Sequence, residues 1–433
     1  MFLNGIRSAS VKPHTPMSLE IKTLETNDKS GQRANPLEAD KKSEATPIPV
    51  LMFGSGITGI GVIRNLSRAG IPVFAMCPDS TFVARSRFCR TLPELGTRVP
   101  KPSELKEFLL SLTLPRAVLM AGSDDWAAAI AALDAPIRQR FPVSTPTLAV
   151  IETFTDKWRF AQLLQKEALP HPSTELLYSL EELHALPESR FENRFLKPLG
   201  SQEFGLKHKV KAFLIHNKAD AISLMAKGEQ SGSSDFPILL QEYIPGPPTN
   251  HYFVDGFVDV NGTIRALFAR RRLRMYPPLL GNSTLMESVP VTAVEGAVNT
   301  IRGMFAALSY RGIFSAEFKL DERDNLFKII EVNARPWWFV EFAARSGVDV
   351  CKMAYEDALG QVVSSRASYT PGRRCVYLPN DFKAFRSYRD HSLIAWLKSW
   401  VGARETVFAA DDPWPGIDHI VQTLYEHFRK GKQ

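Results

Sequence analysis

A short apolar segment followed at once by three closely spaced glycines is the feature of this 433-residue chain that most restricts its fold. Val50 to Phe53 has the length and composition of a buried strand, and Gly54-x-Gly56-x-x-Gly59 then opens a helix. Ile71 to Met76 supplies a second strand, and Ala117 to Met120 repeats the pattern. Because strands that alternate with helices form βαβ units on a parallel sheet, the sequence predicts a Rossmann-like domain at positions 48–150.

The glycine loop has two interpretations that the residues leave open. A tight turn at a helix N-terminus can cradle a pyrophosphate, as it does in NAD-dependent oxidoreductases. Such a site also needs an acid at the end of the second strand to hold the ribose. Ala75-Met76-Cys77-Pro78 stands there, with Asp79 beyond it. The alternative is that the glycines only let the helix pack closely against the first strand.

The amino-acid composition indicates an ordinary globular protein and argues against membrane and nucleic-acid-binding proteins. The hydrophobic fraction of 44% and the charged fraction of 23% are those of ordinary globular proteins. The four cysteines share no metal-binding spacing, and no apolar run approaches the roughly 18 residues of a membrane span. We therefore expect a cytoplasmic protein without a membrane segment. The net charge of +7 is modest, and without a long basic stretch with interleaved aromatic residues we expect no nucleic-acid partner.

The rest of the chain divides into three parts. Residues 1–47 are polar and lack hydrophobic periodicity, so we expect a flexible tail. Residues 151–362 alternate short β-rich segments with a few helices, which predicts an α+β domain of two subdomains with largely antiparallel sheets. Residues 363–433, with one short strand and two amphipathic helices, form a predicted C-terminal arm or small subdomain. The predicted fold class is multidomain, α/β followed by α+β.

Two acidic segments of the second domain form a candidate metal site. Alternate residues of a strand share a face, so Glu331 and Asn333 point the same way, and a hairpin would place Glu317 opposite them. Apolar residues surround Glu331, and a buried carboxylate is costly unless it is paired or binds a metal. Two carboxylates and an amide oxygen suit Mg²⁺. The other interpretation is a structural ion pair with Lys319 or Arg335.

Three further segments have features of a nucleotide site. Lys157 begins a predicted helix. Lys197 ends a short strand and precedes Pro198 to Gly205, a loop of small residues whose N–H groups can contact phosphate. Gln241-Glu242-Tyr243-Ile244 ends another strand in a sharp turn, where the backbone can offer a donor and an acceptor to an adenine edge. Each segment is ordinary alone, but their order along the chain is distinctive.

In this order the motifs resemble those of the ATP-grasp superfamily, and in particular its carboxylate–amine ligases. The similarity is greatest to the branch of carbamoyl-phosphate-synthase-like domains, D-aspartate ligases and predicted carboligases, and it runs from about Pro49 to Gly360. The residues that carry it are Asp156-Lys157, Phe195-Leu196-Lys197-Pro198, Gln241-Glu242-Tyr243-Ile244, Glu317 and Glu331-x-Asn333-x-Arg335. The resemblance implies a Rossmann-like pre-ATP-grasp domain that binds no dinucleotide, followed by an ATP-grasp domain.

The resemblance also implies a role for each matching residue. The residues expected to bind ATP are Lys157, Lys197, Ser201, Gln241, Glu242, Tyr243 and Ile244. Glu317, Glu331 and Asn333 are expected to bind Mg²⁺, with Mn²⁺ as a second candidate. Arg335 and Lys197 are expected to be catalytic, because they would steady the transferred phosphoryl group.

A basic segment offers a candidate substrate contact. Arg270, Arg272 and Arg274 alternate along a predicted strand and would therefore share one face. We interpret this face as a site for a substrate carboxylate or an acyl phosphate, with Arg272 as a third catalytic residue. The other interpretation is a solvated basic edge that protects a strand.

These residues together predict an ATP-dependent, ADP-forming ligase that activates a carboxylate as an acyl phosphate and joins it to an amine. We expect small-molecule substrates and a homodimer. Two departures from the family pattern keep an alternative open. The loop Gly200 to Gly205 has few glycines, and Thr249-Asn250-His251 replaces the acid that commonly binds ribose. The alternative is a catalytically silent ATP-binding sensor or scaffold protein.

Overall fold

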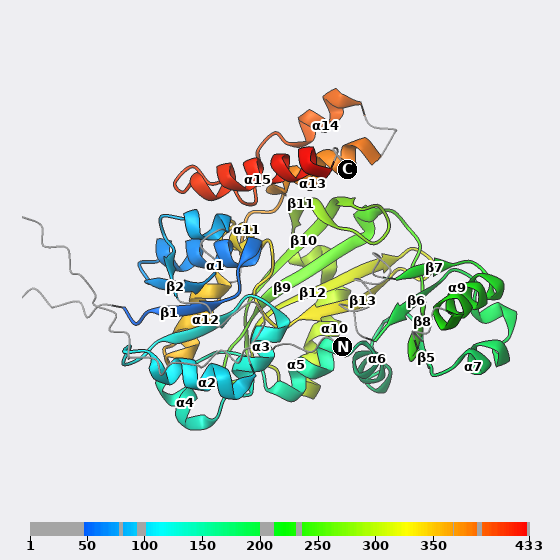
Figure 1. Ribbon diagram of the computed structural model, residues 1–433, viewed down its shortest axis with the longest axis horizontal. Coiled ribbons are helices and arrows are strands. Elements are labelled where there is room, and N and C mark those ends of the chain that lie inside the picture. The colour runs from blue at the N-terminus through cyan, green and yellow to red at the C-terminus, as the bar shows by residue number, and fades with distance from the viewer. Residues whose placement is uncertain are drawn as a thin grey trace, which may run out of the picture.

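The computed structural model describes residues 47–77, 81–92, 101–199, 212–230, 236–366, 368–387 and 392–430. Within these ranges the strands form three sheets. Figure 1 shows the N-terminal sheet at one end of the molecule, a small sheet at the other and a large sheet between them. The predicted tail lies outside the described residues apart from Pro47, and so does the predicted ATP-binding residue Ser201. No helix in the described ranges is long and apolar enough to cross a membrane.

The N-terminal sheet is parallel, as the sequence predicts, with the strand order β3-β2-β1-β4. Its strands are Val50–Phe53 (β1), Val73–Met76 (β2), Arg90–Thr91 (β3) and Val118–Ala121 (β4). Its helices are Gly56–Arg68 (α1), Pro102–Ser111 (α2), Asp124–Ala131 (α3), Ala135–Arg140 (α4) and Leu148–Thr155 (α5), with a 3₁₀ turn at Phe82–Arg85 (η1). Val50 and Met52 belong to one hydrophobic cluster and Leu51 and Phe53 to another, so both faces of the sheet are covered.

The glycine loop between β1 and α1 serves backbone geometry. Gly54 and Gly56 have φ angles of +101° and +77°, which glycine adopts without strain. A Cβ atom at Gly59 would lie 3.1 Å from the carbonyl oxygen of Gly54, so α1 starts close to the end of β1. These contacts support the interpretation that the glycines allow close packing. None of the three lines the cavity described below.

The small sheet is antiparallel, with the strand order β5-β8-β6-β7. Its strands are Thr174–Leu177 (β5), Arg194–Pro198 (β6), Phe213–Ile215 (β7) and Ile238–Glu242 (β8). Around it lie Lys157–Lys166 (α6), Leu180–Ala185 (α7), Lys218–Gln230 (α9) and the 3₁₀ turn Glu188–Arg190 (η2). Asp156 fixes the start of α6, because its carboxylate accepts from the backbone N–H groups of Trp158 and Arg159 at 2.9 and 3.0 Å.

The large sheet has the strand order β13-β12-β9-β10-β11-β14-β15 and is antiparallel up to β14, which confirms the expected strand orientation. Its first five strands along the chain are His251–Val258 (β9), Ile264–Tyr276 (β10), Asn282–Val289 (β11), Gly312–Asp321 (β12) and Leu326–Asn333 (β13). Its helices are Glu295–Leu308 (α10), Val340–Arg345 (α11) and Val350–Ala358 (α12), with 3₁₀ turns at Pro248–Asn250 (η3) and Val291–Val294 (η4). In this half of the chain the sequence patterns predict the strands β6, β8, β9, β10, β12 and β13, but not β5, β7 or β11.

The C-terminal region is built into the large sheet. Arg374–Val376 (β14) pairs with β11, and Ala403–Glu405 (β15) pairs with β14 in parallel. Leu378–Ser387 (α13), Leu393–Ser399 (α14) and Trp414–Lys430 (α15) lie above the sheet in Figure 1. The described part of this region therefore has three helices rather than the expected two. The start of α14 has a local cause. The hydroxyl of Ser392 accepts from the N–H of Ala395 at 3.1 Å and caps the N-terminus of this helix.

Candidate active site

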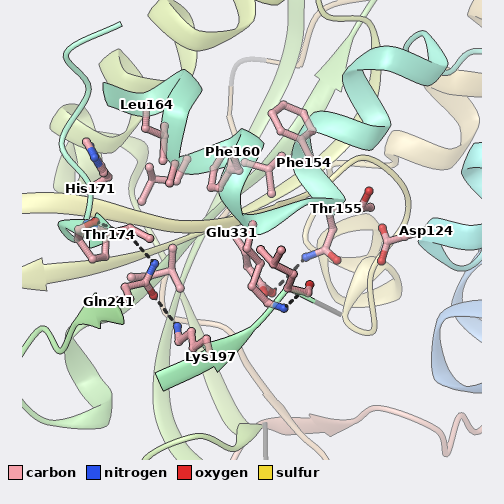
Figure 2. A pocket seen from close by; sticks show the side chains of 18 of the residues that line it. Asp124, Phe154, Thr155, Phe160, Leu164, His171, Thr174, Lys197, Gln241 and Glu331 are labelled. Atoms are coloured by element: carbon pink, nitrogen blue, oxygen red, sulfur yellow. Dashed lines mark hydrogen bonds between the residues drawn. The ribbon is translucent and has the colours of Figure 1, made fainter. Parts of the chain in front are cut away.

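A cavity of about 670 Å³ lies where the small sheet, α6 and β13 meet. Figure 2 shows Lys197, Gln241 and Thr174 joined by hydrogen bonds at one end, Asp124 and Thr155 at the other, and Glu331 between them. The predicted ATP and metal residues that line this cavity are Lys157, Lys197, Gln241, Glu331 and Asn333. They come from α6, β6, β8 and β13, so the fold brings together side chains that are far apart in the sequence.

Two lysines reach the cavity from α6 and β6. The Nζ atom of Lys157 donates to the carbonyl oxygens of Pro198 and Leu199 at 2.8 and 3.1 Å. The Nζ atom of Lys197 donates to the neutral amide of Gln241, at 2.6 Å from Oε1. Burial lowers the pKa of Lys157 and lowers the pKa of Lys197 to about 8, although Glu331 opposes both shifts. A phosphate in the cavity would therefore stabilise the charged form of both lysines.

The predicted adenine hinge follows β8, and much of it is engaged in hydrogen bonds within the protein. The N–H of Glu242 donates to the carbonyl oxygen of Ser173 at 2.8 Å, and the N–H of Tyr243 donates to that of Asn193 at 3.0 Å. The Glu242 carboxylate accepts from the N–H of Ser173 at 3.0 Å. Glu242, Tyr243 and Ile244 do not line the cavity, whereas Gln241 does. The Glu242 carboxylate also accepts from Arg323, in the turn between β12 and β13, so it is held between the small and large sheets and not in the cavity.

The two strands that carry the candidate metal ligands pair as the sequence predicts. Glu317 on β12 lies opposite Glu331 on the antiparallel strand β13. The Nδ2 atom of Asn333 donates to Oε1 of Glu331 at 3.3 Å, so these two side chains share a face. Glu331 is exposed at the cavity, because Ile329 and Val332 take the buried positions of the strand. The expectation that Glu331 is a buried carboxylate is therefore wrong.

Glu317 is the more enclosed of the two acids, and it already has charged partners. Its Oε1 atom accepts from Nδ1 of His251 at 2.7 Å and from Nη2 of Arg272 at 3.0 Å. Burial raises the pKa of Glu317, but Arg272 and His251 outweigh burial and lower the pKa to about 2. Glu317 is therefore ionised near neutral pH. Its ion-pair partner is Arg272, and not the Lys319 or Arg335 that the sequence offered.

Arg335 follows β13, the strand that carries two candidate metal ligands, and links it to the N-terminal domain. It contacts both carboxylate oxygens of Asp124 at 3.0 and 2.9 Å, and its Nη2 atom donates to Oδ1 of Asn333 at 2.8 Å. Asp124 is the first residue of α3, which follows β4 at the carboxyl edge of the parallel sheet. The ion pair therefore fixes Arg335 beside a candidate metal ligand and at the end of the cavity where Asp124 lies (Figure 2).

Arg270, Arg272 and Arg274, the alternating arginines of β10, are largely enclosed by protein. This strand lies between β9 and β11 in the interior of the large sheet, so the interpretation as a solvated basic edge is wrong. Each arginine has a carboxylate partner, and the pairs are Arg270 with Asp255, Arg272 with Glu317 and Arg274 with Asp381. A buried guanidinium stays charged at low cost only with such a partner. Arg272 is the member of this group that lies beside a candidate metal residue.

Three residues near the site have roles that sequence reasoning did not assign. Asp124 and His251 are the partners of Arg335 and Glu317 described above. Lys319 places its Nζ atom 4.9 Å from the centre of the Tyr243 ring, and burial together with Arg272 lowers its pKa to about 8. The alternation of Glu317 and Lys319 along β12 is visible in the sequence. The contact of Lys319 with Tyr243 depends on how β12 approaches the small sheet, and a sequence pattern does not predict that approach.

The candidate metal ligands form an incomplete shell. In the described part of the chain, no group of three or more His, Cys, Asp or Glu side chains is arranged to hold a metal ion. Glu317 and Glu331 supply two carboxylates at paired positions, and Asn333 supplies an amide oxygen. Mg²⁺ accepts such a set because it retains waters and binds phosphate oxygens. The donor chemistry therefore fits Mg²⁺ that arrives with a nucleotide.

Several known proteins resemble this chain in sequence or in fold. No family model matches the chain. The chain is 23% identical over 327 residues to the D-aspartate ligase of Enterococcus faecium (strain Aus0004), covering 72% of this chain and 76% of that protein. The L-amino acid ligase of Bacillus licheniformis has a TM-score of 0.57 and 14% identity, with coverage of 76% and 79%. The ADP complex of N5-carboxyaminoimidazole synthetase from Staphylococcus aureus has a TM-score of 0.56 and 12% identity, with coverage of 75% and 80%.

A further solved structure is the biotin carboxylase domain of the 2-oxoglutarate carboxylase from Hydrogenobacter thermophilus, in complex with MgADP and bicarbonate. It has a TM-score of 0.59 and 15% identity, with coverage of 76% of this chain and 74% of that one. The predicted resemblance to ATP-grasp carboxylate–amine ligases is confirmed by these matches, and the chain has a mixed α/β fold similar to theirs. The prediction of a ligase that uses ATP and Mg²⁺ agrees with them.

Proposed function

We propose that this protein is an ATP-dependent, ADP-forming ligase that joins a small-molecule carboxylate to an amine. The observation that carries the proposal is the meeting, in one cavity, of Lys157 and Lys197 with Glu331 and Asn333. Glu317 adds a second carboxylate opposite Glu331. Mg-ATP requires cations that contact phosphate and oxygen ligands that hold the metal, and this cavity offers both kinds of group.

ATP would lie along the cavity, with its adenine at the end formed by Thr174 and Gln241 (Figure 2). The N–H groups of Glu242 and Tyr243 are engaged within the protein. The hinge contacts that we propose for adenine are therefore the N–H of Ile244 and the carbonyl oxygen of Glu242. These two residues do not line the cavity, so the base would have to reach past Gln241 to contact them. The apolar wall available to the base comes from Phe160, Ala161, Leu164, Ile329 and Ile330. Ser201 stays a proposed phosphate contact that lies outside the described residues.

The chemistry requires position and charge more than covalent participation by the protein. A free carboxylate is a poor acyl donor, because its leaving group would be an oxide. Transfer of the γ-phosphoryl group to it gives an acyl phosphate, and attack by an amine then releases inorganic phosphate. Such transfers are accelerated by in-line positioning and by positive charge around the phosphoryl oxygens. Bound Mg²⁺, held by Glu317, Glu331 and Asn333, would supply part of that charge.

Three side chains of the protein would supply the rest. Lys197 would contact the phosphate oxygens, and it is charged most fully below pH 8 because its pKa is about 8 without nucleotide. Arg335, oriented by Asp124 and adjacent to Asn333, would steady the transferred phosphoryl group. Arg272, paired with Glu317, would lie beside the metal and contact the carboxylate or acyl phosphate.

The proposal includes the domain arrangement of such ligases. The tail would occupy residues 1–47, the Rossmann-like pre-ATP-grasp domain 48–150, the ATP-grasp domain 151–362 and the C-terminal arm 363–433. Asp124, at the carboxyl edge of the first sheet, lies at the end of the cavity away from Gln241 (Figure 2). The first domain would therefore face the γ-phosphate, where the carboxylate substrate must enter. We also propose a homodimer.

The second candidate is an ATP-binding sensor or scaffold without catalytic activity. It is favoured by the partners of Glu317, since a metal would have to compete with Arg272 and His251 for that carboxylate. The exposed position of Glu331 at the cavity argues against it, because a protein that transfers no phosphoryl group has less use for an acid there.

The experiment that separates the two candidates measures ADP and phosphate released from Mg-ATP by the full chain, with and without a pool of amino acids and small organic acids. A ligase is expected to release ADP only when the pool is present, and dividing the pool then identifies the carboxylate and the amine. Absence of ADP in both conditions, with a melting temperature raised by Mg-ATP, would support the sensor. Absence of any melting shift would contradict both candidates.

A further inference from the structure

A second cavity lies between α11 and the β14–β15 edge of the large sheet. Its volume is about 190 Å³, and arginines supply most of its polar lining, namely Arg345, Arg373, Arg374 and Arg404. None of the lining residues is acidic, and none belongs to the ATP cavity. Figure 1 shows α11 beside α1 and below the C-terminal helices, away from the small sheet that forms the wall of the ATP cavity. The two cavities are therefore separate.

Two of the four arginines are neutralised by acids that also serve other arginines. Arg345 contacts Glu341 at 2.7 Å, and Arg374 contacts Glu287 at 3.1 Å. Glu341 in turn contacts Arg64 at 3.2 Å and Arg68 at 2.8 Å, and Glu287 contacts Arg271 at 3.6 Å. These carboxylates are therefore shared, and they have little charge left to offset a further guanidinium.

Arg373 and Arg404 have no carboxylate partner in the described part of the chain. Arg373 donates to the backbone carbonyl oxygen of Arg345, which carries no net charge. Arg404 has neither an ion pair nor a side-chain hydrogen bond with any described residue, and its side chain is exposed. Like charges that are held at one cavity repel each other and disfavour the compact state. An anion between them would remove that cost.

An apolar cavity adjoins the arginines. Arg345 and Arg404 also line a space of about 410 Å³, together with Phe408, Ala409 and Ala410. Phe408 is 43% exposed, so its ring is accessible from this space. Two acids also line this space. Asp411 is held mainly by Arg68, at 2.7 and 2.8 Å, and lies 3.5 Å from Nη2 of Arg345, while the Glu405 carboxylate accepts from the N–H of Val407 at 2.6 Å. A strongly basic space is thus continuous with a partly apolar one.

We propose that these adjoining cavities bind a small organic phosphate monoester. Its phosphate would lie among Arg345, Arg373, Arg374 and Arg404, and its organic group would lie against Phe408. A phosphate monoester carries about −1.5 to −2 charges near pH 7, which matches the two guanidinium groups without carboxylate partners. A single carboxylate would offset one of them. Arginine also contacts phosphate oxygens in a bidentate manner, which adds geometric selectivity. The site does not depend on the proposed ligase activity.

The test titrates phenyl phosphate into the full chain and follows binding by calorimetry. The double variant Arg373→Gln/Arg404→Gln is expected to raise the dissociation constant at least about tenfold, because it removes both unneutralised charges. Arg386→Gln, at an exposed arginine of α13 outside both cavities, is the matched control and is expected to bind like wild type. Lys197→Gln, in the ATP cavity, is also expected to leave the affinity unchanged.

Two further measurements test which class of anion binds and whether a folding defect explains a loss of binding. Benzoate, with one negative charge on the same ring, is expected to bind at least about tenfold more weakly than phenyl phosphate. If the double variant fails to fold, the single variant Arg404→Gln is used instead, because the Arg404 side chain has no ion pair or hydrogen bond with any described residue. The proposal is overturned if wild type does not bind phenyl phosphate, if benzoate binds equally well, or if affinity falls in Lys197→Gln but not in the arginine variants.

Discussion

Two sets of basic side chains lie near the candidate active site, and they differ in what neutralises them. Arg270 and Arg272 on β10 contact the carboxylates of Asp255 and Glu317, at shortest distances of 2.5 and 3.0 Å. Lys197 on β6 has uncharged side-chain contacts: its Nζ atom donates to the amide of Gln241 and lies 5.2 Å from the centre of the Phe195 ring. All three side chains are at least partly withdrawn from solvent. Burial therefore does not separate the two sets, whereas the charge of the partner does.

This difference indicates where an anionic substrate can bind. A guanidinium that is paired with a buried carboxylate contributes to the folded state, and removal of either partner leaves an isolated charge. An ammonium group that is paired with an amide keeps its charge available to a phosphate. We therefore expect the densest basic segment of the sequence to be mainly structural apart from the proposed substrate contact Arg272. We expect Lys197, at the end of a short strand, to be the better phosphate contact.

The largest expected effect is on stability. Arg270→Met is expected to destabilise the protein by about 3–5 kcal/mol, because it leaves Asp255 buried without its ion-pair partner. Denaturant unfolding measures the effect. Arg271→Met, on the same strand, is the control: its partner Glu287 lies at 3.6 Å and its side chain is 36% exposed, so the expected cost is at most about 1 kcal/mol. An equal loss of unfolding free energy in both variants would contradict the view that the buried carboxylate partner distinguishes Arg270.

The next effect is on catalysis. Lys197→Gln is expected to lower kcat/KM for ATP by about 100- to 1000-fold, because it removes a charge from the phosphoryl oxygens. Its stability is expected to stay near that of wild type, since burial already disfavours the charged lysine. The control is Lys166→Gln, at a lysine of α6 that is 80% exposed. A Lys197→Gln enzyme that uses ATP as well as the control does would show that this lysine is structural.

A smaller effect concerns pH. Burial lowers the pKa of Lys197 to about 8, so the free enzyme loses this positive charge as the pH rises through 8. We expect kcat/KM for ATP to fall above that pH by up to about tenfold per pH unit, since phosphate favours the charged form. Lys197→Arg keeps its charge throughout this range and is expected to flatten the profile. Identical profiles for the two proteins would assign the titration to another group.

The smallest effect concerns the orientation of Arg335. Asp124→Asn keeps the shape of the side chain but removes the charge that holds this guanidinium. We expect kcat to fall about fivefold, the equivalent of roughly 1 kcal/mol, because the pair is partly exposed. KM for ATP is expected to change little. The control is Glu152→Gln on α5, which breaks an exposed ion pair with Arg159 at 3.4 Å and is expected to leave kcat unchanged.

The sequence predicts the parts of the fold whose signals are local. The apolar segment Val50–Phe53 and its glycines predict the parallel sheet, and the spacing of Glu331 and Asn333 predicts their shared face. The pairing of Glu317 with Glu331 follows from a short turn between two strands. Each of these inferences requires only the period of a strand or the geometry of a connection.

Other features depend on contacts between distant segments, which a pattern along the chain does not contain. Arg335 and Asp124 are separated by 211 positions in the sequence, and their ion pair forms only when β13 approaches the edge of the first sheet. The interior position of β10 requires β11, a strand that the residue pattern did not predict. Without that neighbour, Arg270, Arg272 and Arg274 resemble an exposed edge and not a buried row.

The most direct test of the account is ADP release from Mg-ATP by Glu331→Gln, measured with the substrate pool that supports turnover by wild type. We predict that the variant keeps its fold and loses ADP release at least about 100-fold, because a metal-binding carboxylate is lost where the phosphoryl charge develops. Glu295→Gln, at an exposed acid on α10, is predicted to match wild type. ADP release by Glu331→Gln at the wild-type rate would contradict the assignment of this cavity as the Mg-ATP site.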